Sequence, residues 1–279
     1  MLRVKHIRNA RDGNGIAIDG DCYHIIEGGL LGGSTGHRLW EASTTKSYEL
    51  GTRLTTPDGR VFKYAKAGAT LVPNFGCQNY NTQCVAYANI AHVVAQYSKT
   101  ITLDVAVTDG AAGDGAIAKN ELRGGYFIIF PHDDNAINGM ILTNTAIAAG
   151  GGEMTITVDI EMPTALTVDT DDIELMASPY EDVRSTNSDT KSIVGVPSVP
   201  ATVGQYCWLQ TWGPCWISPQ AGAGAGAHDR QVVFRHDGSL DEHDYSDAYT
   251  AKQQHAGFVL ANAAGAGQGA PFIMLQISI

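Results

Sequence analysis

Alternation of apolar and polar residues dominates the chain from Tyr48 onward. The clearest case is MTITVDIEM at residues 154–162, where Ile156, Val158 and Ile160 alternate with threonine and acidic residues. This period of two predicts a half-buried antiparallel strand. Other segments rich in β-branched and aromatic residues end at turn signals and predict further strands. These segments are 101–108, 124–130, 173–179, 232–240, 257–265 and 272–279.

Turn-forming residues within this pattern predict β-hairpins. A Pro-Asp-Gly turn at 57–59 separates residues 48–56 from residues 60–68, and an Asp-Gly pair lies at 237–238. Residues 82–97 are the one segment that favours a helix, although their apolar residues form no clean stripe. Ten or more short strands without strand–helix alternation predict an all-β protein. We expect an antiparallel β-barrel or sandwich with an extended N-terminal arm and little helix.

Composition shifts predict how the chain is divided. Residues 1–47 contain many glycines and no sustained period, so we expect an extended, loop-rich N-terminal arm. Residues 48–185 are expected to form a β-rich domain. The polar stretch at 182–192 is a candidate boundary, and the strands of residues 193–279 then complete or adjoin the same β domain.

Charge and cysteine content limit the classes of partner. The chain has 279 residues and a net charge of −11, which argues against binding to nucleic acid. No apolar run is long enough to span a membrane, and no secretory signal is visible. Five widely spaced cysteines favour free, buried thiols in a reducing compartment. One basic cluster near the start either contacts an acidic partner surface or forms a solvated arm. Its residues are Arg3, Lys5, Arg8 and Arg11.

Residues 204–218, GQYCWLQTWGPCWIS, carry three of the four tryptophans and no charged residue. Their aromatic and β-branched residues, interrupted by Trp-Gly-Pro, predict two short strands around a tight turn. So many large apolar side chains are expected to line either a core or a subunit interface. The candidates for either role are Tyr206, Trp208, Trp212 and Trp216.

No short motif fits a catalytic or metal-binding pattern. Residues 32–36 match Gly-x-Ser-x-Gly but lie in a glycine-rich stretch without the strand and helix that this motif needs. The acidic run at 169–172 lacks the glycine and the distant glutamate of a calcium loop. Histidines and aspartates at 132–134 and 236–247 have none of the usual metal or acid–base spacings. We therefore expect no enzyme, no metal and no cofactor.

Five segments, in this order, resemble head decoration (capsid cement) proteins of tailed bacteriophages. Together they cover most of the chain after Tyr48. The segments are LGTRLTTPDGRVFKYAKAGAT (50–70), LRGGYFIIFP (122–131), ELMASPYEDVRST (174–186), VGVPSVPATVGQYCWLQTWGPCWI (194–217) and the closing GFVLANAAG with FIMLQISI (257–265 and 272–279).

The resemblance implies a β-rich homotrimer on the outer surface of an icosahedral head. Such a protein lies at local threefold positions and clamps neighbouring subunits of the phage major capsid protein. It is made in the host cytoplasm, resides in the virion and has no active site. The residues before Tyr48 have no counterpart in the resemblance, so it implies no role for them.

Two other functions compete with this one. The first is a glycan-binding β-sandwich on a virion or cell surface, using exposed aromatics such as Trp40, Trp212 or Trp216. The second is a hydrolase on a β scaffold, using His132 with Asp133 or the loop at 236–247. A major capsid protein is disfavoured because no segment supplies the long spine helix of that fold.

Overall fold

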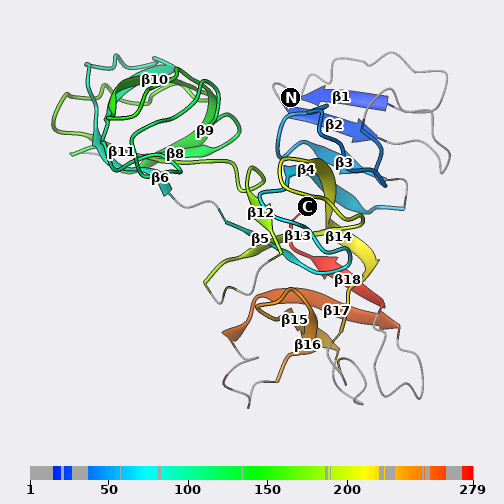
Figure 1. The fold of residues 1–279 in the computed structure, drawn as a ribbon. Coiled ribbons are helices and arrows are strands. Elements are labelled where there is room, and N and C mark those ends of the chain that lie inside the picture. Colours follow the sequence, from blue (N-terminus) through cyan, green and yellow to red (C-terminus); the bar gives the residue numbers. More distant parts are fainter. Residues whose placement is uncertain are drawn as a thin grey trace. The chain divides into compact units, whose positions relative to one another are not determined.

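The structure is a computed structural model of the chain. The residues that it describes are 15–19, 22–26, 37–56, 58–80, 83–132, 135–185, 188, 190–219, 223, 230–244, 246, 248, 252–261 and 272–278. Within these ranges the protein is all-β, as predicted, with curled antiparallel sheets and no α-helix (Figure 1). In the same ranges, no helix has the length and apolar character needed to cross a membrane.

The chain forms two compact units, one inserted into the other in sequence. The split unit consists of Met1–Tyr80 with Tyr180–Ile279, and the inserted unit is Asn81–Pro179. This division differs from the expected 48–185 and 193–279. The reason is a pairing between strands far apart in sequence: β4 (Val61–Lys66) lies beside β14 (Tyr206–Trp216) in one sheet. Local composition carries no signal for such a pairing.

The split unit is built on one large sheet (Figure 1). Its main strand order is β1-β2-β3-β4-β14-β18-β17-β15-β16, while β5, β12 and β13 pair beside this path. The remaining strands are β1 (Gly15–Asp19), β2 (Cys22–Ile26), β3 (Arg53–Thr55), β5 (Cys77–Asn79), β12 (Val183–Arg184), β13 (Ile193–Pro197), β15 (Gln231–Phe234), β16 (Leu240–Glu242), β17 (His255–Ala261) and β18 (Phe272–Gln276). The predicted hairpins β3–β4 and β15–β16 are confirmed.

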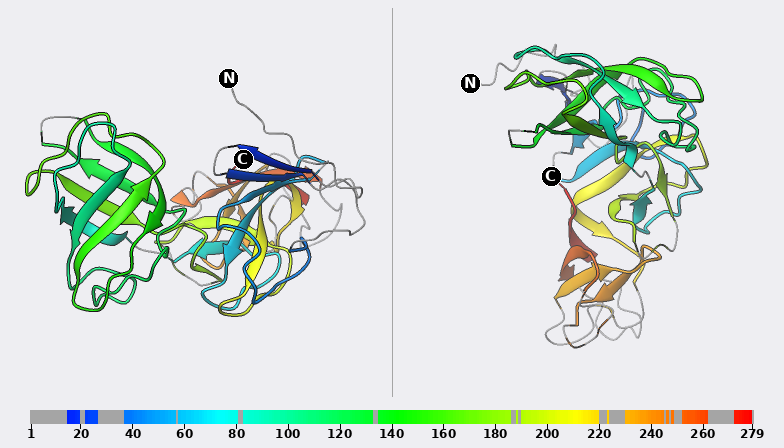
Figure 2. Two further views of the ribbon diagram at one scale, coloured as in Figure 1. Left: turned by 90° about the horizontal axis from the view of Figure 1, so that it is seen from above. Right: turned by 90° about the vertical axis from the view of Figure 1, so that its left-hand side faces the viewer.

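The inserted unit is a single six-stranded sheet, drawn in green in Figure 2. Its strand order is β6-β11-β8-β9-β10-β7. The sheet curls until its first and last strands meet, at a bridge between Ile90 and Leu103. The inward side chains, among them Phe127, Ile156 and Leu175, form its core. The strands are β6 (Gln83–Asn89), β7 (Thr100–Val105), β8 (Tyr126–Phe130), β9 (Ile137–Asn144), β10 (Gly152–Val158) and β11 (Asp172–Met176).

The helix expected at residues 82–97 is wrong. Gln83–Asn89 is strand β6, which pairs with β11, and the chain then continues without regular structure. Ile90, Val93 and Val94 have helical spacing, but Val85 falls outside it, so the segment has no continuous apolar stripe. Tertiary pairing therefore decides its conformation.

The N-terminal arm expected at residues 1–47 contains two strands. Strands β1 and β2 pair antiparallel, and β2 pairs parallel with β3. Further along, Leu39 is buried in the core of the split unit, and Ser43 forms a bridge with Tyr206. Part of the segment 1–47 thus belongs to the split unit, because it pairs with strands that follow Tyr48. The basic residues Arg3, Lys5, Arg8 and Arg11 lie outside the described residues.

Candidate interaction surface

Strand β14 carries all three tryptophans of the uncharged segment. It is one continuous strand of 11 residues, so the expected pair of short strands around a turn is wrong. Pro214 is tolerated because β14 pairs with β4 only as far as Trp212. After Trp212, β18 is the one described strand that pairs with β14. A proline on the open side of a strand interrupts no ladder there.

A bulge in β14 separates the tryptophans. Gln210 lies opposite Phe62 and Trp212 lies opposite Val61, so Thr211 is an extra residue in the strand. One extra residue shifts the alternation of side chains to the other face. Trp208 therefore shares a face with Phe62, whereas Trp212 and Trp216 lie on the opposite face.

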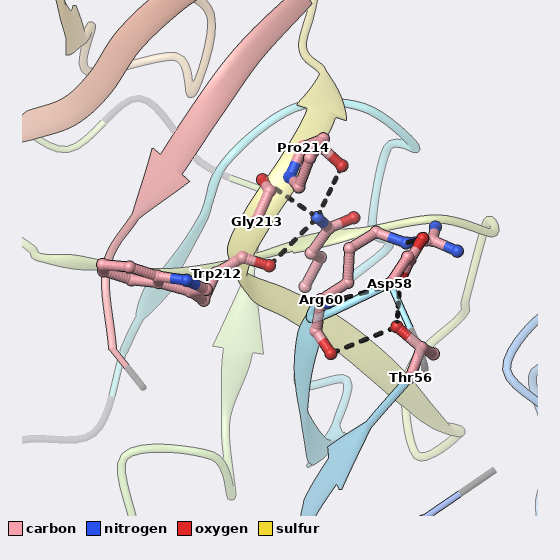
Figure 3. Close-up of polar contacts among 7 residues, drawn as sticks. Thr56, Asp58, Arg60, Trp212, Gly213 and Pro214 are labelled. Carbon is pink, nitrogen blue, oxygen red and sulfur yellow. Dashed lines mark hydrogen bonds and ion pairs between the residues drawn. The ribbon is translucent and has the colours of Figure 1, made fainter. Parts of the chain in front are cut away.

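Buried Gln210 holds the backbone that follows the bulge (Figure 3). Its Nε2 lies 3.2 Å from the carbonyl oxygen of Trp212, 3.3 Å from that of Gly213 and 3.0 Å from that of Pro214. Gly213 has φ +96°, and a Cβ there would lie 2.9 Å from Cγ and 3.0 Å from Cα of Arg60. Arg60 is itself held by an ion pair from its Nε to Asp58 at 2.8 Å. Position 213 thus requires glycine for both its conformation and its close contact.

Replacing Gly213 with alanine is expected to destabilise the chain by about 1–3 kcal/mol, because it adds backbone strain and a clash with Arg60. Gly204 is the matched control, since it has φ +82° but no atom within 4 Å of the point where a Cβ would lie. Urea unfolding should therefore show a smaller loss for Gly204→Ala than for Gly213→Ala. Equal losses would mean that the contact with Arg60 contributes nothing.

Trp208 is fully buried in an aromatic core. Its ring centroid lies 5.0 Å from that of Tyr64 and 5.4 Å from that of Tyr48. Its Nε1–H donates to the carbonyl oxygen of His37 at 3.1 Å. Tyr206 is half-buried and stacks on Tyr64, with centroids 5.8 Å apart. The sequence left core and subunit interface open for these residues, and the geometry places Trp208 and Tyr206 in the core.

The same core contains a hydrogen-bonded histidine. His37 Nε2 lies 2.7 Å from the carbonyl oxygen of Glu41, which only accepts, so this nitrogen carries the proton. Nδ1 then accepts from the Tyr64 hydroxyl at 2.8 Å, and that hydroxyl accepts from the backbone N–H of Ser47 at 3.1 Å. Both ring nitrogens have hydrogen-bond partners within the core, so His37 is a structural group.

The opposite face of this sheet is apolar and exposed. In β14, Trp212 is half-buried and Trp216 is 42% exposed. Cross-strand pairing places Trp216 opposite Phe272 and Pro214 opposite Met274. The next strand, β17, adds two exposed side chains to the same face. We call this surface the aromatic face; its residues are Trp212, Pro214, Trp216, Phe258, Leu260, Phe272, Met274 and Gln276.

None of the eight residues of the aromatic face is charged, and Gln276 is the one with a polar side chain. The reverse side of the same strands is a buried core that contains Cys215, Val259 and Ile273. The sheet is therefore apolar on both sides, although only one side is covered by the described part of the chain. An exposed cluster of large apolar side chains is typical of a surface that binds another molecule.

The sequence identified part of this surface and missed the rest. Trp212 and Trp216 were candidates, whereas Phe258, Leu260, Phe272 and Met274 were not. Their signal was present, because FVL in β17 and FIMLQ in β18 place apolar residues on both faces of a strand. A strand that is apolar on both sides is either central in a protein or part of an interface.

Four of the five cysteines have described side chains, and burial lowers the reactivity of each. These four, Cys77, Cys84, Cys207 and Cys215, are free and buried. Burial raises the pKa of the Cys207 and Cys215 thiols to about 12 and that of Cys84 to about 11. Burial likewise raises the pKa of Cys77 well above its usual range. The expectation of buried, unpaired thiols is confirmed for these four.

We expect these four thiols to resist Ellman's reagent in the folded protein at pH 8, because the reactive thiolate is absent and access is blocked. The titration should count at most one fast-reacting thiol in the native chain and all five of its cysteines in denaturant. Two or more fast-reacting thiols in the native chain would contradict the described burial.

Two of the weaker polar candidates, Asp171 and Asp237, have structural roles. Asp171 is buried, and its carboxylate accepts from the backbone N–H groups of His132 and Thr167, which fixes a turn. Asp237 caps the β15–β16 hairpin through Ser239. Asp133 and residues 32–36 lie outside the described residues. Across the described ranges, no group of three or more histidine, cysteine, aspartate or glutamate residues is arranged to hold a metal ion.

Comparisons of the chain with protein-family models, with curated proteins and with solved structures found no match.

Proposed function

We propose that this chain is a structural head decoration protein, which binds the outer surface of an icosahedral capsid as a homotrimer. The observation that carries the proposal is the aromatic face, a surface of eight uncharged residues on β14, β18 and β17, of which four are exposed and four are half-buried. The resemblance of five sequence segments to capsid cement proteins supplies the class of assembly.

The composition of the aromatic face favours a protein interface over a small-ligand site. Interface cores are enriched in aromatic residues and methionine and depleted of charge. A glycan platform also uses aromatic rings, but it needs several polar groups to hold the sugar hydroxyls. Gln276 is the one polar side chain among its eight residues, and exposed Gln231 of β15 lies opposite Phe258 at its edge. The glycan-binding alternative, which relies on Trp212 and Trp216 here or on Trp40 elsewhere, therefore ranks second.

The chemistry of the aromatic face also favours other copies of the same chain as its occupant. The chain carries a net charge of −11, so most encounters between copies are repulsive. Copies that meet through an uncharged face bring no like charges together. Symmetric assemblies are the usual outcome of such self-association, and the resemblance gives three as the number of copies.

In this proposal the trimer stabilises the head by mass action. A protein that binds the assembled shell, and not its separated subunits, shifts the equilibrium toward the assembled state. Its partner is the major capsid protein, and no step requires catalysis, a cofactor, a nucleic acid or a membrane.

Co-sedimentation tests the proposal. Purified chain is mixed with isolated capsid shells and centrifuged, and the shells are then heated with and without bound chain. The proposal predicts that the chain pellets with the shells and raises the temperature at which they release their contents. If the chain stays in the supernatant, while added sugars quench its tryptophan fluorescence, the glycan-binding alternative replaces this proposal.

A further inference from the structure

A second exposed surface lies on the inserted unit, across β6, β11 and β8. Tyr126 and Phe130 of β8 lie opposite Met176 and Asp172 of β11, and Ile128 lies opposite Glu174. Because paired residues share a face, the outward side of these strands combines apolar rings with carboxylates. We call this surface the acidic–aromatic face and define it by Tyr87, Tyr126, Ile128, Phe130, Asp172 and Glu174.

Tyr87 reaches this surface from a strained bulge. Ala88 pairs with Ile173 and Val85 pairs with Leu175. Between these pairs, Ala86 and Tyr87 of β6 lie opposite the single residue Glu174 of β11. Tyr87 has φ +45°, which is unusual for a residue with a large side chain. Tyr87 is 65% exposed, and its ring stacks on that of Phe130, with centroids 5.5 Å apart and planes 19° apart. Since β11 lies between β6 and β8, the ring of Tyr87 spans the strand that carries the two carboxylates.

The two carboxylates are unpaired in the part of the chain that is described. Asp172 and Glu174 are both half-buried, and neither side chain makes a hydrogen bond or ion pair there. Carboxylates beside exposed aromatic rings form a site for cationic side chains, because the acids pair with the charge and the ring faces attract it.

The charge of the chain is divided unequally between the two units. Residues 81–179 contain 13 acidic and three basic residues, a net charge of −10 out of −11. The split unit, with 16 acidic and 15 basic residues, is nearly neutral. The inserted unit is therefore an acidic surface that attracts basic segments.

We propose that the acidic–aromatic face binds the basic segment of residues 3–11 from a neighbouring copy of this chain. That segment carries Arg3, Lys5, Arg8 and Arg11 and no acidic residue. Asp172 and Glu174 are two residues apart on one face of a strand, a separation of about 6.6 Å. Arg3 and Lys5 have the same two-residue spacing, so an extended segment presents two charges that match the two carboxylates. Arg8 or Arg11 then stacks on the exposed rings.

A peptide titration tests this inference independently of any capsid. A fluorescent peptide of residues 1–14 is added to a chain that begins at Asp12, and binding is followed by anisotropy. We expect saturable binding that weakens as salt is added. The double substitution D172N/E174Q should raise the Kd about tenfold, because two partly exposed ion pairs are lost. Tyr87→Ala should also weaken binding.

The matched control is E153Q/E161Q, which removes the same charge from exposed positions elsewhere on the inserted unit. It should change the Kd by less than about twofold, because Glu153 and Glu161 lie outside the acidic–aromatic face. An attraction that depended on net charge alone would instead weaken equally in both double variants. Thermal unfolding of each variant checks that its fold is intact. Equal Kd values for the two double variants, or no saturable binding of the peptide, would overturn the inference.

Discussion

Replacing Trp208 with alanine is expected to destabilise the chain by about 3–5 kcal/mol, the range for truncating a large buried aromatic residue. Trp208 is fully buried, and its ring packs against Tyr48 and Tyr64. The substitution also leaves the carbonyl of His37 without the N–H that it accepts from. Denaturant unfolding measures the loss as a lower midpoint.

Trp40 is the matched control for this substitution. Its side chain is 64% exposed, so Trp40→Ala should change the free energy of unfolding by no more than about 0.5 kcal/mol. A loss below about 1 kcal/mol for Trp208→Ala would contradict its place in the core.

The double substitution W216E/F272E is expected to convert the proposed trimer into monomers. The two rings lie opposite each other on β14 and β18, and each is 42% exposed in the single chain. Glutamates are therefore tolerated in the monomer, where water reaches them. In an assembly that buries the aromatic face, they bring unpaired charges into the interface, at a cost of several kcal/mol.

Molar mass and thermal stability separate this effect from misfolding. The variant should show the mass of one chain, 29.6 kDa, with a melting temperature close to that of the separated wild-type chain. Trp40→Glu places the same charge at an exposed tryptophan outside the aromatic face and should leave the mass unchanged. If W216E/F272E keeps the wild-type mass, the aromatic face is not the interface between copies.

The fold class could be predicted because it depends on local signals. Alternation in residues 154–162 and turn chemistry at residues 57–59 and 237–238 are properties of short stretches. The structure confirms both hairpins and a strand in the first stretch, although that strand ends at Val158. The helix at residues 82–97 was wrong because β6 takes its conformation from pairing with β11. The division into units was hidden because it depends on β4 pairing with β14.

The candidate surface could be predicted only in part. The tryptophan segment stood out because it lacks charge, but equal spacing gave Trp208, Trp212 and Trp216 no distinct roles. The extra residue at Thr211, which sends Trp208 inward and the other two outward, follows from pairing with β4. The concentration of acidic residues in the inserted unit becomes visible only once its boundaries are known.

We propose that copies of this chain assemble through an uncharged surface and then bind a capsid. Light scattering on the purified chain, alone and after mixing with isolated shells, tests it most directly. We expect a mass three times that of the 29.6 kDa chain and a trimer that moves with the shells. A monomer that ignores the shells would contradict it.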